Sequence, residues 1–110
     1  MAENKEYMTR ALEHGSVSIN EDVITTIAVA AVKDVEGVVS QKNDRKSVRV
    51  QLGEESVELE CGLVVLYGHS VVGIAKNVQN AVTNAVESMT GLKVSHVDVN
   101  VVGISMGKQA

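Results

Sequence analysis

The sequence predicts an α/β (α+β) fold of two layers, in which two helices pack on one face of a small mixed β-sheet. Two stretches carry apolar residues at helical spacing, and other stretches alternate apolar with polar residues. The elements follow in the order strand, helix, strands, helix, strand. Because 110 residues are the size of one ordinary domain, we expect a single domain at residues 15–105. A flexible N-terminal arm at residues 1–14 precedes it, and a short tail at residues 106–110 follows it.

The first helix is expected after a short strand at residues 16–19. Asn20 is a residue type that begins helices, and Glu21 and Asp22 follow it, where the helix dipole favours negative charge. Gly37 is a residue type that ends helices. The apolar stripe of this helix consists of Ile24, Ile27, Ala28, Ala31, Val32 and Val35.

A β-hairpin is predicted next, after a short extended piece at residues 38–40 and a polar loop at residues 41–46. Residues 47–52 and 57–67 both alternate, and the four residues 53–56 between them form the connection. A register with Leu52 opposite Val57 places the apolar side chains of both strands on one face. It also places Arg49 opposite Glu60, which predicts a cross-strand ion pair worth about 0.2 to 1 kcal/mol.

The second helix and the last strand complete the pattern. Ser70 can cap the helix and Gly91 can end it. The helix stripe consists of Val71, Ile74, Ala75, Val78, Ala81, Val82, Ala85, Val86 and Met89. The strand has Val97, Val99 and Val101 on one face and Asp98, Asn100 and Val102 on the other. With 22 valines and two aromatic residues, the core must be aliphatic.

Three apolar residues are expected on the sheet face that the helices leave open. Val64 and Leu66 lie out of phase with the inward residues of their strand, and Val102 does so in the last strand. Exposed apolar clusters on soluble proteins mark interaction sites. We therefore predict that Val64, Leu66 and Val102 form a partner-binding surface.

Composition and charge disfavour several classes of function. The formal net charge is −4, and the chain has no Trp or Phe, so it lacks both the basic surface and the stacking side chains that bind nucleic acid. Its apolar runs are far shorter than the roughly 20 residues of a membrane-spanning helix. The N-terminus lacks the apolar centre of a secretory signal. We expect a cytoplasmic protein that does not insert into a membrane.

A glycine-rich turn at residues 68–73 is the first of the motifs that suggest chemistry. Gly68 and Gly73 have the spacing of a phosphate-binding loop, but Ile74 and Ala75 stand where that loop requires lysine and a hydroxyl residue. We interpret the glycines as a turn between a strand and a helix.

Cysteine, histidine and glutamate side chains are the remaining candidates for chemistry. Cys61 lies on the inward face of its strand, and neither His69 nor His96 forms paired metal-ligand spacing with it. The acidic cluster of Glu54, Glu55, Glu58 and Glu60 lacks the pattern of a calcium loop and is interpreted as a solvated face. We expect no catalytic, cofactor or metal site, and hence no enzyme.

The chain resembles the alkaline shock protein 23 / general stress protein 24 family of envelope stress response proteins in Gram-positive bacteria. The resemblance spans residues 15–104, and its most specific part is the junction Met89, Thr90, Gly91 and Leu92. Further matching stretches are residues 15–19, 23–24, 27–28, 37–38, 67–68, 78–79, 85–94 and 97–101, with Ala31 and Gly103.

The resemblance implies a small cytoplasmic, non-enzymatic protein that forms homo-oligomers. It implies protein partners, including a membrane-anchored one that holds such a chain at the inner membrane face, and a role in cell-envelope homeostasis. An alternative hypothesis is a regulatory protein that binds a fatty-acid-synthesis enzyme through the same open sheet face.

Overall fold

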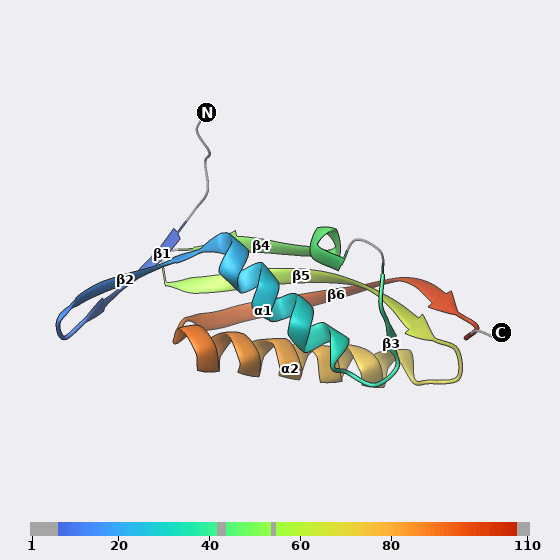
Figure 1. Ribbon diagram of the computed structural model, residues 1–110. Helices are drawn as coiled ribbons and strands as arrows, with labels where there is room; N and C mark the ends of the chain where they lie inside the picture. Colours follow the sequence, from blue (N-terminus) through green and yellow to red (C-terminus); the bar gives the residue numbers. More distant parts are fainter. Residues whose placement is uncertain (1–6, 42–43, 54, 108–110) are drawn as a thin grey trace, which may run out of the picture.

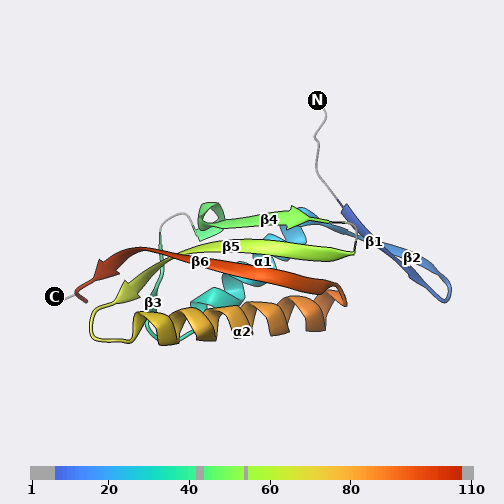
Figure 2. The ribbon, with the colours of Figure 1, turned by 180° about the vertical axis from the view of Figure 1, so that it is seen from behind.

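The computed structural model describes residues 7–41, 44–53 and 55–107 and has the predicted α+β architecture. Its sheet is built around β5 (Ser56–Leu66), and α1 (Glu21–Lys33) and α2 (Val71–Thr90) pack on one face of it (Figure 1). The other face is open (Figure 2). The fold class inferred from the sequence is therefore confirmed.

The N-terminal segment departs from the prediction of a flexible arm at residues 1–14. β1 (Tyr7–Leu12) pairs antiparallel with β2 (Gly15–Asn20), and the two form a ribbon that projects from the body (Figure 1). Residues 1–6 lie outside the described residues. Met8 is buried in the core, and the Arg10 guanidinium donates a hydrogen bond to the Gly91 carbonyl across 2.8 Å. These contacts anchor the base of the ribbon. The pairing is invisible to hydrophobic patterning because most of its side chains are exposed on both faces.

The first helix begins as predicted. The Asn20 side chain accepts a hydrogen bond from the Asp22 N–H across 2.7 Å, which satisfies one of the N–H groups that a helix leaves free at its start. The helix ends at Lys33, and Gly37 follows after one further turn with a φ of 94°. All six residues of the predicted stripe, from Ile24 to Val35, are buried.

The hairpin also has the predicted register. β3 (Val38–Val39) and a short 3₁₀ helix (Asp44–Ser47) lead into β4 (Val48–Leu52), which pairs antiparallel with β5. Leu52 lies opposite Val57, and Arg49 lies opposite Glu60. β3 pairs with the far end of the same edge of β5, so β5 has neighbours along both of its edges.

The predicted ion pair between Arg49 and Glu60 is wrong. Among the described residues the structure forms no such pair, although the two positions face each other. Asn100 donates its side-chain N–H to the Glu60 carboxylate across 2.7 Å. The Glu60 carboxylate therefore bonds a neutral amide on β6. The hairpin pattern considered only the two strands β4 and β5, where Arg49 was the available partner.

The second helix has both predicted ends. The Ser70 hydroxyl oxygen accepts a hydrogen bond from the Gly73 N–H across 3.0 Å. Gly91 has a φ of 74° and donates its N–H to the Glu87 carbonyl across 2.9 Å. The left-handed backbone at this position explains the glycine, because a Cβ is disfavoured there.

β6 (Lys93–Ser105) returns parallel to β5 along its whole length. The register shifts between Leu63 and Val64, where Val102 is the extra residue on β6. Past β6, Met106 and Gly107 of the predicted tail have no regular structure, and residues 108–110 lie outside the described part.

The core lies between β5 and the helices. The inward residues of β5 are Val57, Leu59, Cys61, Leu63 and Val65, and each is at most 2% exposed. The opposing residues of α2 are Ile74, Val78, Val82 and Val86, and all are buried. The core therefore consists of aliphatic side chains and one thiol, as the composition predicted.

We predict that Gly91→Ala lowers the free energy of unfolding by about 1 to 2 kcal/mol, because the Cβ of alanine is strained in the left-handed backbone at the end of α2. Gly91→Asn is the matched control and should lose less, since asparagine tolerates this conformation. Urea titration followed by circular dichroism measures both. Equal losses would show that the φ of Gly91 does not set its contribution.

Candidate functional site

The predicted surface of Val64, Leu66 and Val102 is assembled on the open face. Val64 and Leu66 lie on the C-terminal half of β5 and are half-buried, whereas Val102 on β6 is 66% exposed. Glycines lie beside these side chains. A Cβ added at Gly62 would lie 3.9 Å from the Val102 side chain. Val102 is therefore the one residue of the three that is exposed, and the role of this surface in binding stays a prediction.

Other exposed apolar residues gather at the same end of the molecule. We call the set the apolar end. Its members are large, hydrophobic and exposed: Tyr67, Val71, Val72, Val101, Val102, Ile104 and Met106. They belong to the turn after β5, to the first turn of α2, and to the C-terminal half of β6 with Met106 directly after it. These segments meet at the end of the molecule near the C-terminus (Figure 1). The Tyr67 N–H donates to the Ser105 carbonyl across 2.8 Å and ties the turn to β6.

Sequence reasoning assigned some of this set to the core. Val71 was expected in the inward stripe of α2, and Val101 on the inward face of β6, but both are exposed. Met89 at the other end of the α2 stripe is exposed as well. The sequence holds one signal that identifies such positions: valine pairs at 71–72 and 101–102 place an apolar residue on both faces of an element that has only one covered face.

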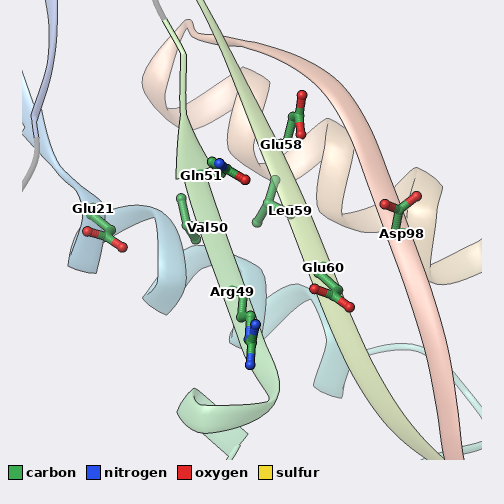
Figure 3. Close-up of a pocket in the computed structure, with 8 residues that line it drawn as sticks. All are labelled: Glu21, Arg49, Val50, Gln51, Glu58, Leu59, Glu60 and Asp98. Atoms are coloured by element: carbon green, nitrogen blue, oxygen red, sulfur yellow. The ribbon is translucent and has the colours of Figure 1, made fainter.

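An acidic hollow occupies the N-terminal half of the open face. It has a volume of about 400 Å³, and its polar lining comes from three neighbouring strands and from the start of α1 (Figure 3). These residues are Glu21, Arg49, Gln51, Glu58, Glu60 and Asp98. Arg49 extends along β4, away from Glu60 (Figure 3). Glu58 and Glu60 are exposed, in agreement with a solvated face. Glu55 is exposed too, and Glu54 lies outside the described residues.

Cys61 and the two candidate histidines are not brought together. Cys61 faces the core from β5, His69 is exposed in the turn before α2, and His96 is exposed on β6. Within residues 7–41, 44–53 and 55–107, no three His, Cys, Asp or Glu side chains could hold a metal ion. Burial, and to a smaller extent the charge of Glu60, raises the pKa of the Cys61 thiol to about 11. This is the environment of an unreactive thiol.

The glycine-rich turn at residues 68–73 leads the chain from β5 into α2. Gly68 has a φ of 98°, which favours glycine, and Ser70 uses its side chain to cap α2. The N–H of Gly73, which a phosphate-binding loop would direct at its ligand, donates to Ser70 instead. The geometry agrees with the interpretation of a turn.

The structure is thus a small α+β domain with apolar side chains exposed at one end. The sequence profile of the alkaline shock protein 23 family, described as having a cell envelope-related function, matches residues 9–106. The chain therefore belongs to this family. In the described part of the chain, the helices are too short or too polar to cross a bilayer.

Two relatives from Bacillus subtilis (strain 168) show the same membership. YqhY is 27% identical over 110 residues, covering 87% of this chain and 82% of YqhY. YloU is 26% identical over 108 residues, covering 84% of this chain and 90% of YloU. Both carry the description of uncharacterised proteins.

Among solved structures the chain is similar to the MamM CTD. One variant of that domain aligns with a TM-score of 0.53 and 17% identity, covering 76% of this chain and 98% of the domain. Its copper form aligns with a TM-score of 0.52 and 16% identity, covering 82% and 92%. At this level of identity the likeness concerns the fold alone.

We predict that Cys61 resists thiol reagents in the folded protein. With a pKa of about 11, roughly one thiol in a thousand is ionised at pH 8, and the side chain is also buried. Labelling with an Ellman-type reagent should be at least about a hundredfold slower in buffer than in denaturing guanidinium.

A matched variant tests the labelling assay itself. Ser88→Cys places a thiol at an exposed position on α2 and should label rapidly in the folded state. Rapid labelling of the unaltered chain under native conditions would contradict the inert thiol and reopen a role for Cys61 in chemistry.

Proposed function

We propose that this chain is a non-enzymatic protein of the bacterial cell envelope that works by self-association and by binding a membrane-anchored protein at the cytoplasmic face. The observation that carries the proposal is the apolar end. Seven large hydrophobic side chains are exposed there on three adjoining segments. Leaving such a set in water opposes solubility, so its retention favours a docking role.

The distribution of charge supports a protein partner over a lipid surface. The open face beside the apolar end carries Glu58, Glu60 and Asp98 in the acidic hollow, and the chain has a formal net charge of −4. Anionic lipid headgroups attract basic residues and repel acidic ones. An apolar surface bordered by carboxylates therefore suits an apolar protein surface with a neutral or basic rim.

The membership in an envelope-related family supports the location of the proposed partner. Catalysis would require a nucleophile or a general acid or base held in a cleft. In the described part of the chain, Cys61 is buried against the core, and the exposed histidines lie on different segments. The arrangement favours binding over a reaction.

The test is co-sedimentation of the full chain with membranes of its native host. Val102→Asp should reduce the sedimenting fraction by about tenfold, because it would place a carboxylate in an apolar contact. Val23→Asp is the matched control, since Val23 is a valine on α1 that is 46% exposed, and it should leave sedimentation unchanged. Circular dichroism checks that both variants fold.

Two outcomes would overturn the proposal. Equal sedimentation of the Val102 variant and the unaltered chain would exclude this surface. Equal binding to protein-free vesicles containing phosphatidylglycerol would show that lipid, rather than an anchored protein, is the ligand.

A further inference from the structure

The open face of the sheet carries three kinds of residue in succession along β5. Glu58 and Glu60 come first, Gly62 follows, and Val64 and Leu66 end the row. These positions alternate with the buried residues of the strand, so they share the face that the helices leave open (Figure 2). The face therefore changes from negative charge to apolar surface along a single strand.

Two hollows join along this row. Next to the acidic hollow lies a second hollow of about 240 Å³, lined by Ser47, Arg49, Glu60, Gly62, Asn100 and Val102. Arg49 and Glu60 line both hollows. The two thus form one depression that runs from the carboxylates to Val102, and we call it the open-face trough.

Gly62 lies in the second hollow, on the strand at the centre of the sheet. Neither the backbone nor the packing requires glycine there. Its φ is not positive, and the atoms nearest to an added Cβ, which belong to Ser47 and Val102, would lie 3.6 to 3.9 Å away, at ordinary contact distances. Glycine weakens the interior of a strand and is typical of places where another backbone approaches closely. The missing side chain keeps the trough open.

The carboxylates of the trough have few partners in the described part of the chain. Asn100 bonds Glu60, but no hydrogen bond or ion pair from a described residue reaches Glu58 or Asp98. Among the described lining residues Arg49 alone is a cation, and it extends away from Glu60 (Figure 3). One end of the trough therefore carries an excess of negative charge, which a basic ligand would neutralise.

We propose, building on the membrane-anchored partner proposed above, that the open-face trough binds an amphipathic helix of that partner. Lysine or arginine side chains of the helix lie in the acidic hollow, and its apolar side chains pack against Val64, Leu66 and Val102. Charge complementarity fixes the direction of the helix, because only one end of the trough is acidic.

The occupant is a helix because the sheet face offers no partners to a bound backbone. The N–H and C=O groups of β5 along the trough are used in the ladders with β4 and β6. A segment that lies over this face must satisfy its own backbone groups, and a helix does so. α1 and α2 cover the other face of the same sheet in this way (Figure 1).

The length of the trough sets the spacing of contacts on the helix. Glu60 and Val64 are four residues apart on β5, which corresponds to about 13 Å. Along a helix that rises about 1.5 Å per residue, this distance separates basic from apolar contact residues by about nine positions. Membrane proteins contain such segments, because the cytoplasmic loops next to their spans carry an excess of lysine and arginine.

The first test neutralises the two carboxylates that no described residue bonds. Titration of the full chain with membranes of its native host gives an apparent Kd. Glu58→Gln combined with Asp98→Asn should weaken binding by about three- to tenfold, since each partly exposed ion pair contributes little. Raising the salt concentration should weaken binding of the unaltered chain more than binding of this double variant.

The matched control removes the same two charges elsewhere. Glu13→Gln combined with Asp34→Asn neutralises one glutamate in the turn of the ribbon and one aspartate at the end of α1, and both are exposed. This control should bind as the unaltered chain does and respond equally to salt. Circular dichroism checks that both double variants fold.

The second test closes the trough without changing its charge. Gly62→Val adds a side chain in the second hollow and should weaken membrane binding by at least about tenfold, because the helix can no longer approach the sheet. Valine favours strands and has room at this position. Urea titration should therefore show no loss in the free energy of unfolding, which separates blocked binding from misfolding.

The outcomes separate this inference from the proposed function. Full binding by the Glu58 and Asp98 double variant, with binding lost in Val102→Asp, would overturn the inference and leave the proposed function in place. Tighter binding by the double variant would show an anionic ligand and would also overturn it. Full binding by Gly62→Val would exclude a helix across the trough. An unaltered chain that does not sediment with membranes would overturn the proposed function together with this inference.

Discussion

The packing of β5 against α2 is the constraint on which the rest of the structure depends. β5 is the one strand with neighbours along both edges in the described part of the chain, and its inward side chains are almost fully buried. Each of these residues is aliphatic or a thiol, so the contact between β5 and α2 depends on packing. The side-chain hydrogen bonds that α2 makes to the sheet reach β6, through Gln79 and Glu87. Position is set by shape: valines of α2 fill the space over the pleat of β5. A helix covering one face of a strand in this way leaves the opposite face without cover.

The functional surfaces follow from this one-sided cover. A sheet face in contact with water is usually polar, and the open face is polar at the acidic hollow between β4, β5 and β6. Toward the C-terminal ends of β5 and β6 the same face is apolar, since it carries Val64, Leu66 and Val102. The bulge at Val102 contributes to the exposure, because the extra residue shifts the alternation of β6 against β5. The face is thus divided into a solvated half and an apolar half.

Local signals made most of this fold predictable from the sequence. The caps at Asn20 and Ser70, the turn at Gly91 and the hairpin register depend on residues close together in the chain, and all were predicted correctly. The strand β1 was missed because its side chains alternate between two exposed faces, so pairing with β2 leaves no hydrophobic pattern.

The predictions that depended on distant contacts were less successful. The ion pair of Arg49 failed because Asn100, forty residues beyond Glu60, bonds the carboxylate instead. The exposed apolar residues at this end of the molecule were predicted only in part, since exposure of Val71 and Val101 depends on where α2 and β6 separate. A bulge carries no sequence pattern of its own. The divergence of α2 and β6 depends on the twist of the folded sheet, which the sequence does not show.

The division of the open face also determines which contacts the apolar end can make. Carboxylates at Glu58, Glu60 and Asp98 raise the negative potential over the solvated half, and this repels phosphate groups that come close to it. The uncharged segment at residues 99–107 lies beside that half on the same strand. Phosphate groups are therefore repelled from one half of the face, whereas the other half offers apolar side chains and no charge.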